Sequence, residues 1–264
     1  MSVDHDLVDA AAQSAAAAAM RSGVIIRPLT ELTEFVACDA LFSVIWGRDE
    51  GAPMPVNLLR ALSSAGSYVV GAYAGTQMLG ACVGFWAAPD RPAMHSHIAG
   101  VTAAARGRDL GFALKLHQRA RALRCGVPVI NWTFDPLIAR NAHFNICKLG
   151  GRPVKYAVNY YGEMPDAINA GDETDRMLLR WELDSPRARA ACDGVPMAPH
   201  ASPAHTVLVE VPPDIEGLRR TDPQRAAAWR LQLRDRLLPM LERGDMIIDF
   251  DRRLGGYIVA RGPS

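Results

Sequence analysis

The chain has 264 residues, 49% of them hydrophobic and 22% charged, which is ordinary for a folded protein with one large domain or two small ones. Its formal net charge of +1 excludes a general attraction to nucleic acid or to an anionic membrane, so we expect neither as a partner. No apolar run approaches the roughly 20 residues of a membrane-spanning helix, and the five cysteines form no CxxC pair, which favours free thiols in the cytoplasm.

The first half of the chain alternates helical and extended patterns. Residues 1–22 are rich in Ala and carry acidic residues instead of a basic region near their start, which predicts a frayed or docked helix and not a signal peptide. Gly126 is typical of a helix C-terminal cap. The periodicity predicts strands at 24–27, 67–73, 78–87 and 94–101, and helices at 31–46, 56–64 and 107–125.

The second half predicts strands at 127–135, 154–161 and 177–183 and a helix at 139–149. This mixture indicates an α/β layer with a partly parallel sheet. A segment rich in Ala, Pro and Arg follows and is interpreted as a linker. Beyond it we expect a strand at 207–211, a helix with apolar residues four apart, and a hairpin of 246–250 with 257–260. This tail is either a degenerate second copy of the middle of the main fold or an addition that extends its sheet.

The most informative stretch is the strand, turn and helix from Ile98 to Leu114. The first turn of a helix leaves N–H groups without partners inside the helix, and the helix dipole adds positive charge there, so the turn suits a pyrophosphate. Gly107 and Gly111 allow close approach of the backbone. The alternative is an ordinary turn with solvated arginines. Positive charge is supplied by Arg106 and Arg108 and extended along the helix by Lys115 and Arg119.

Residues 106–111, Arg-Gly-Arg-Asp-Leu-Gly, resemble the Arg/Gln-x-x-Gly-x-Gly/Ala motif of the GNAT acyltransferase superfamily. The order of elements agrees over residues 24–183, and an uncharacterised bacterial branch is similar at 132–137, 141–142, 160–162 and 175–176. The resemblance implies an α/β (α+β) GNAT fold, with a mixed central sheet flanked by helices and a small C-terminal strand-helix-hairpin extension. The predicted domains are an Ala-rich segment (1–22), a GNAT acyltransferase domain (23–184), a linker (185–204) and the extension (205–264).

The resemblance also implies a set of cofactor-binding residues. The strand edge would pair its backbone with the pantetheine arm of the cofactor through Ala99, Gly100 and Val101. The pyrophosphate would be held by Arg106, Gly107, Arg108, Asp109, Leu110, Gly111 and Phe112. Two residues depart from the family pattern: Asp109 stands where Gly is usual, and the position of a Tyr that often protonates the leaving thiolate falls on Ile146.

Direct attack of an amine on a thioester needs a base, and His97 is our first candidate because it is near the expected thioester. His95 lies two residues earlier and faces the same side if the strand is regular, although a bulge would change this. A hydrogen-bonded structural histidine is the alternative for either ring. A His-x-His metal site has no further ligand cluster, so we predict no metal. His117 lies in the apolar stripe of its helix and is interpreted as a hydrogen-bonded core histidine.

Asp135 ends a predicted strand, where it would act as a base or bind the substrate amine, or else cap the following turn. Cys125 and Cys147 lack an adjacent base in the sequence, which argues against covalent catalysis.

Two tyrosines and an arginine are candidates for the acceptor side of the site. Alternation along the predicted strand 154–161 would turn only one of Tyr160 and Tyr161 toward the site. We assign Tyr161 as general acid and Tyr160 to substrate binding. Arg176 is assigned to a substrate carboxylate, with an ion pair to Asp175 or Asp172 as the alternative.

The leading hypothesis is therefore an N-acyltransferase that uses acetyl-CoA or another short acyl-CoA to acylate the amine of a small molecule, with an amino-acid-like acceptor suiting Arg176. One rival is a non-catalytic acyl-CoA-binding or regulatory protein, which the two departures from the family pattern favour. The other is a protein acetyltransferase. The resemblance also favours a homodimer, by analogy alone.

Overall fold

The computed structural model describes residues 4–47, 53–162, 164, 171–195 and 206–262. The chain divides into two compact units, Met1–Asn131 and Trp132–Ser264. The division falls inside the segment 23–184 that we predicted as one acyltransferase domain. None of the described helices combines the length and the apolar character that crossing a membrane requires.

The first unit contains the elements up to the beginning of β5 (Val129–Phe134), which continues into the second unit. The predicted helix 56–64 and strand 94–101 are confirmed to the residue, and the other predicted elements before residue 102 differ by one or two residues at their ends. The elements are α1 (His5–Arg21), β1 (Ile25–Pro28), α2 (Leu32–Trp46), α3 (Val56–Ser64), β2 (Tyr68–Ala74), β3 (Gln77–Trp86), β4 (Met94–Val101), the 3-10 turn η1 (Ala103–Ala105) and α4 (Leu110–Arg124).

The sheet of the first unit is mixed, as predicted. Its strands follow the order β1-β2-β3-β4, each antiparallel to the next, and β4 is parallel to the first residues of β5. The β2–β3 hairpin turns at Gly75, whose φ of 58° lies in the left-handed region that favours glycine.

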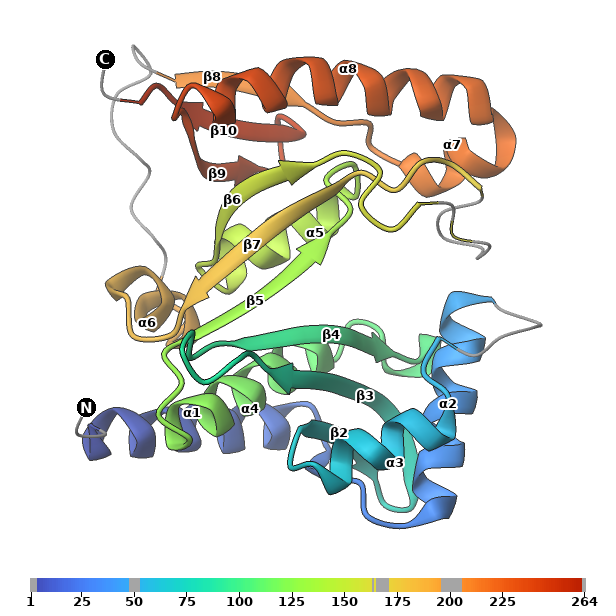
Figure 1. Ribbon diagram of the computed structural model, residues 1–264, viewed down its shortest axis with the longest axis vertical. Helices are drawn as coiled ribbons and strands as arrows, with labels where there is room; N and C mark the ends of the chain where they lie inside the picture. The colour runs from blue at the N-terminus through green and yellow to red at the C-terminus, as the bar shows by residue number, and fades with distance from the viewer. Residues whose placement is uncertain (1–3, 48–52, 163, 165–170, 196–205, 263–264) are drawn as a thin grey trace. The chain divides into compact units, whose positions relative to one another are not determined.

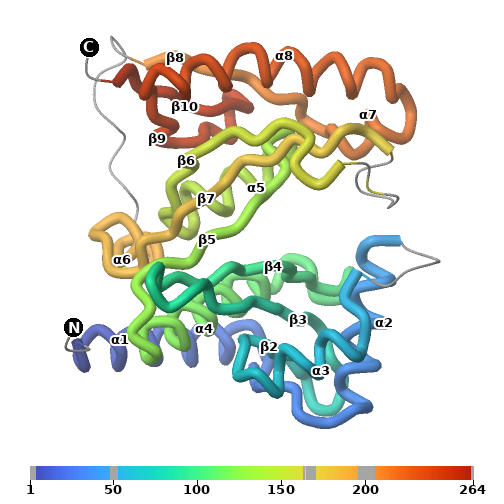
Figure 2. The backbone as a smooth tube through the Cα atoms, viewed as in Figure 1, coloured from blue at the N-terminus to red at the C-terminus, as the bar shows by residue number. Residues whose placement is uncertain are grey.

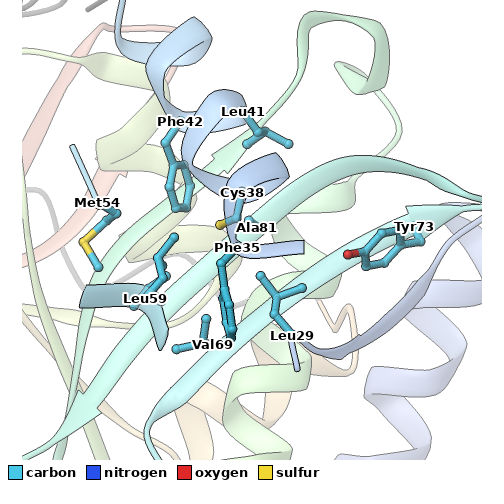
Figure 3. Packing of buried hydrophobic residues seen from close by; sticks show 11 residues of the cluster. Leu29, Phe35, Cys38, Leu41, Phe42, Met54, Leu59, Val69, Tyr73 and Ala81 are labelled. Carbon is cyan, nitrogen blue, oxygen red and sulfur yellow. The ribbon is translucent and has the colours of Figure 1, made fainter. Parts of the chain in front are cut away.

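Helices cover both faces of this sheet (Figure 1). Gly80 of β3 faces Leu110 and Leu114 of α4, whereas Ala81, the next residue, faces the helices α2 and α3. Figure 3 shows the core on the α2 and α3 side. Its buried residues are Leu29, Phe35, Cys38, Leu41, Phe42, Met54, Leu59, Val69, Tyr73, Ala81 and Val83.

Residues 5–21 of the Ala-rich segment form the helix α1, which is docked on the first unit. Asp4 caps α1 by accepting a hydrogen bond from the N–H of Leu7, at 3.2 Å. Ala11, Ala15 and Ala18 are buried at three- and four-residue spacing, and α1 packs along α4.

In the second unit, β7 lies between β5 and β6 and is antiparallel to β6. The remaining elements are α5 (Ala139–His143), the π-turn η2 (Phe144–Lys148), β6 (Arg152–Ala157), β7 (Arg176–Glu182), α6 (Pro186–Cys192), β8 (Thr206–Glu210), α7 (Ile215–Thr221), α8 (Pro223–Glu242), β9 (Met246–Asp251) and β10 (Gly256–Ala260).

The C-terminal extension has its own antiparallel sheet, in the order β8-β10-β9, so of the two alternatives for this tail the one in which it extends the main sheet is wrong. The predicted hairpin is confirmed as β9 and β10, with the turn at Gly255. Leu233 and Leu237 are buried on α8, whereas the helix α7 was not predicted. The phenol of Tyr257 donates a hydrogen bond of 2.6 Å to the carbonyl of Pro136.

Three other predictions need correction. The segment 185–204 predicted as a linker contains α6, which starts at the Ser185 cap with Pro186 in its first turn. The helix predicted from Gly107 begins at Leu110, because Gly107 and Asp109 have left-handed φ values of 79° and 58°. The strand predicted to residue 161 ends at Ala157, so residues 158–161 are not part of a strand.

Packing in the α2 core leads to a stability prediction. Phe35 is 2% exposed, and Phe35→Ala is expected to lower the free energy of unfolding by about 3–5 kcal/mol because it leaves a cavity. The neighbouring Val36 is 51% exposed, and Val36→Ala is expected to change it by less than about 0.5 kcal/mol. Chemical denaturation of both variants tests this, and equal losses would contradict the packing described.

Candidate functional site

The edge of β4 is open beyond its first two residues. β4 pairs with β3 along its length, but with β5 only through Met94 and His95. In the described part of the chain, no strand pairs with this second edge from residue 96 to residue 101. An unpaired strand edge presents N–H and C=O groups to an extended ligand that carries amides. The predicted pantetheine contacts lie on this segment: Ala99, Gly100 and Val101.

One face of this strand segment is tightly covered by α2. A Cβ atom added to Gly100 would lie 2.7 Å from Cδ1 of Ile45 and 3.0 Å from Cζ3 of Trp46. A larger residue at this position would require the Ile45 side chain to move. The packing holds the backbone of β4 in place while its edge stays open.

β4 contains a bulge where its two histidines lie. The register with β3 shifts between Val83 and Gly84, which leaves His97 as the extra residue. The rings of His95 and His97 nevertheless lie 6.0 Å apart, and both are near Phe85, at 5.0 and 5.9 Å. Desolvation lowers the pKa of each imidazole below its ordinary value of 6.5, so both are neutral at pH 7. Among the described residues, no group of three or more His, Cys, Asp or Glu side chains is arranged to hold a metal ion.

Figure 2 shows the path of the backbone from β4 into α4. The turn between them is exposed from residue 106 to residue 109. The N–H groups of Arg106 and Arg108 bond back to the carbonyls of Ala103 and Ala105, at 3.2 and 3.3 Å. The N–H of Phe112 bonds to the carbonyl of Asp109, at 3.0 Å. The N–H groups of residues 110 and 111 precede the first acceptor inside the helix and therefore point out of its end.

The two glycines of this turn have open space around them. A Cβ atom added to Gly107 or Gly111 would meet no atom within 4 Å. Packing within the protein therefore does not require glycine at residue 111, and the turn is neither buried nor covered. A bulky anion has room to approach the helix end directly.

The charged residues of the turn are placed differently from one another. Nη2 of Arg108 lies 3.0 Å from the position of a Cβ on Gly23, so its guanidinium rests against the junction of α1 and β1. Arg106 and Asp109 are exposed, and the Asp109 side chain makes no capping bond to α4. We expected Lys115 and Arg119 to extend the positive charge of the turn along the helix, but both side chains are buried and present no charge at the surface.

Within the second unit, Tyr161 lies near the predicted acceptor residues. Its hydroxyl is 2.9 Å from the hydroxyl of Thr133 on β5, and its N–H donates to Oγ1 of Thr174 at 2.9 Å. The ring of Tyr160 packs edge-on against it, with ring centroids 4.7 Å apart. Both tyrosines are partly exposed, at 48% for Tyr160 and 41% for Tyr161. Since they lie in a turn, the strand alternation that we used to separate them does not apply.

Arg176, at the start of β7, is buried. Its guanidinium donates to the carbonyl of Asp175 at 2.9 Å and lies 5.6 Å from the centroid of the Tyr161 ring. The alternative ion pairs that we considered are made by other arginines. Arg234 of α8 binds the Asp175 carboxylate at 2.8 and 2.9 Å, and Arg230 binds Asp172 at 3.0 Å. Sequence reasoning missed these two α8 arginines, although their spacing of four places them on one helix face.

Asp135 is buried, and its carboxylate has two partners. One oxygen accepts a hydrogen bond from the N–H of Leu137 at 2.9 Å, which is the turn-capping alternative. The other lies 2.7 Å from Nη1 of Arg219, which is also buried. This arrangement favours a structural role over a catalytic base, because both carboxylate oxygens already contact partners inside the protein.

No protein-family model and no curated protein matches the chain. Solved structures do. An N-acetyltransferase from Staphylococcus aureus Mu50 matches with a TM-score of 0.51 and 14% identity, covering 61% of this chain and 99% of its own. A Salmonella typhimurium protein described as an acetyltransferase with its cofactor acetyl-CoA matches with a TM-score of 0.50 and 19% identity, covering 68% of this chain and 99% of its own.

The chain has the GNAT fold. The position where GNAT enzymes often carry a tyrosine is Ile146, which lies in the π-turn η2 and is fully buried, so it supplies no proton.

Cys147 does have a carboxylate neighbour, contrary to our expectation, with its Sγ 3.0 Å from Oδ1 of Asp249. Burial raises the pKa of this thiol to about 12, so Cys147 is a hydrogen-bond donor and not a nucleophile.

A buried lysine, Lys115 of α4, lies beneath the strand β4. Nζ of Lys115 donates to Oγ of Ser96 at 2.7 Å and to Oε1 of Gln118 at 3.2 Å. Desolvation lowers the pKa of Lys115 to about 8. Ser96 lies between His95 and His97, so this lysine ties α4 to the strand position of the candidate base.

Lys115 leads to a prediction about stability and pH. Its ammonium loses a proton near pH 8 in the folded protein and near 10.5 when unfolded, so the unfolded chain binds more protons between these values. This group therefore makes the free energy of unfolding rise with pH across that interval. Lys115→Met should remove the rise, whereas Lys155→Met, at an exposed position of β6, should keep it. Urea denaturation at several pH values measures this, and an unchanged slope in Lys115→Met would contradict the assignment.

Proposed function

We propose that the chain is an acyl-CoA-dependent N-acyltransferase, using acetyl-CoA or another short acyl-CoA, that acylates the amine of a small molecule. The observation that carries this proposal is the open edge of β4 leading into an exposed glycine turn at the start of α4. The GNAT fold supports it, since two solved structures described as acetyltransferases share that fold.

In this proposal the acyl-CoA lies along β4 and the turn. The backbone of Ala99, Gly100 and Val101 pairs with the pantetheine amides, and the pyrophosphate accepts hydrogen bonds from N–H groups within residues 106–112. The exposed guanidinium of Arg106 adds charge next to the phosphates. The thioester supplies the acyl group, and the protein residues only bind, orient and move protons.

The proposed reaction is direct attack by the neutral amine on the thioester carbonyl. The carbon–nitrogen bond forms, the carbon–sulfur bond breaks, and the amine gives its proton to His97, whose imidazole is neutral at pH 7. Tyr161 donates a proton to the leaving thiolate. Asp135 is not assigned as a base, because its carboxylate is held by Leu137 and Arg219.

The proposed acceptor is an amine that also carries a carboxylate, such as an amino acid. Arg176 supports this choice, because a buried guanidinium suits a bidentate contact with a carboxylate. The ring of Tyr160, next to Tyr161, provides an exposed apolar surface for the acceptor side chain.

A thiol-release assay with acetyl-CoA and a panel of amino acids, simple amines and peptides tests the proposal. Release of CoA with amino acids supports it. Binding of acetyl-CoA without turnover of any amine would favour a non-catalytic acyl-CoA-binding protein, and turnover only with peptides would favour a protein acetyltransferase.

The glycine turn yields a binding prediction. Gly111 is the second residue of α4 and has open space around it, so Gly111→Trp should leave the fold intact while its indole fills the pyrophosphate position. We expect CoA binding by calorimetry to become undetectable. The matched control is Asn57→Trp at the exposed second residue of α3, which should bind CoA like the unchanged protein. Equal affinities for both variants would rule out the turn as the binding site.

The candidate base yields a pH prediction. Because desolvation lowers the pKa of His97 below 6.5, kcat/KM should fall on the acidic side only below that pH. His97→Gln should lower kcat by roughly 100-fold and remove this acidic limb, with CoA affinity unchanged. His95→Gln is the control and should retain the limb. A His97→Gln enzyme with the original pH profile would show that another group accepts the proton.

A further inference from the structure

The first unit contains a second cavity, separate from the turn at the start of α4. Its volume is about 790 Å³, within the range of small-molecule binding sites. It lies among α1, β1, the start of β2 and the later part of α4, and none of residues 99–112 lines it. Figure 1 shows α1 and α4 side by side, as their packing contacts require.

Most of the cavity wall is apolar and built from small side chains. α1 contributes the alanines at positions 12, 15, 16 and 19, β1 adds Ile26, and Val24 lines the cavity just before that strand. Because alanine side chains are short, the helix stays close to the sheet while leaving space that larger residues would fill. Such a wall suits an apolar chain or ring, and it offers few hydrogen-bond partners to a polar ligand.

One side of the cavity is positively charged. Arg121 and Arg124 are exposed and lie three residues apart, on the same face of α4. No Asp or Glu is among the described residues that line the cavity, and neither arginine forms an ion pair within the described part of the chain. Among the described residues, no carboxylate pairs with the charge at this end of the cavity.

His117, on the same helix as these arginines, also lines the cavity, and their charges affect its pKa. Its Nδ1 lies 2.8 Å from the hydroxyl of Tyr68, which confirms the prediction of a hydrogen-bonded core histidine. Desolvation, with the charges of Arg124 and Arg121, lowers the pKa of His117 to about 4. The imidazole is thus neutral at pH 7, and the two guanidinium groups remain the cations of the cavity.

We propose that this cavity binds an amphipathic carboxylate, with its apolar part along the alanines of α1 and its carboxylate at Arg121 and Arg124. A guanidinium pairs with a carboxylate through two parallel hydrogen bonds, so two adjacent arginines select an anion over a neutral or cationic ligand of equal size. The site is independent of acyl-CoA binding at the α4 turn. It goes beyond the proposed acyl transfer and does not require it.

The experiment measures binding of dodecanoate to the full chain by calorimetry and by displacement of anilinonaphthalene sulfonate fluorescence. Dodecanoate should bind at one site per chain, and dodecylamine and dodecanol should bind at least about tenfold more weakly. The double variant Arg121→Gln/Arg124→Gln should weaken the binding of dodecanoate by roughly tenfold or more and leave the affinity for dodecanol unchanged. Its control, Arg60→Gln/Arg91→Gln, removes the same charge at exposed positions outside the cavity and should bind like the unchanged protein.

A second pair of variants tests the apolar wall. Ala16→Trp should fill the cavity and abolish dodecanoate binding, whereas Ala10→Trp, exposed on α1 outside the cavity, should not. CoA affinity should be the same in all variants, which separates this site from the α4 turn. Dodecanoate binding that survives both the arginine and the Ala16 changes, or no binding at all, overturns the proposal. One further outcome would also overturn the proposal: the protein binds no dodecanoate, but it self-associates, and sedimentation shows that Ala16→Trp abolishes this self-association. The cavity would then be a contact with a second copy of the chain.

Discussion

The candidate site depends on a backbone constraint: the chain must pass from β4 into α4 while leaving open space at Gly107 and Gly111. Two residues of the turn have left-handed φ values, 79° at Gly107 and 58° at Asp109. Asp is among the few residues besides glycine that adopt this conformation at modest cost, of the order of 1 kcal/mol. Asp109 therefore preserves the conformation that glycine usually provides in this motif, and the departure from the GNAT pattern changes charge more than shape.

The strand that leads into this turn is held from both faces and left open at one edge. On one face, Ile45 and Trp46 pack directly on Gly100. On the other, the buried ammonium of Lys115 reaches Ser96 and fixes α4 against the strand. Burying an amine is unfavourable unless hydrogen bonds compensate for the lost water, so this contact is specific in its geometry. A rigid strand with an unpaired edge is a suitable template for an extended ligand, because little order has to be gained on binding.

In the second unit, the C-terminal extension contributes directly to the turn that carries the two tyrosines. Arg234 of α8 binds the carboxylate of Asp175, which also accepts hydrogen bonds from Tyr156 and from the N–H of Asn159. Thr174, the preceding residue, bonds to the N–H groups of Tyr160 and Tyr161 through its carbonyl and its hydroxyl. The extension therefore helps, through Arg234, to hold the backbone of the candidate acceptor residues, in addition to forming a sheet of its own.

These contacts also mark where sequence reasoning succeeds and fails. Periodicity located β4 and α3 to the residue, because their apolar pattern is local and the neighbouring turns have clear signals. It extended β6 through Tyr161, because nothing in the apolar pattern shows that Asn159 takes a φ of 43° and binds the backbone of Thr174.

The partners of single side chains were missed for a related reason. Asp135 looked available as a base because its partner, Arg219, is 84 positions away in the sequence. Lys115 looked like surface charge because its partner, Ser96, lies on another element. An ionisable side chain in a sequence shows its chemistry but not its partner, and in this protein the partner decides whether the group is exposed to a ligand or used to hold the fold. The prediction for the glycine turn does not depend on such a partner, because the proposed binding uses backbone groups whose direction is set by the start of the helix itself.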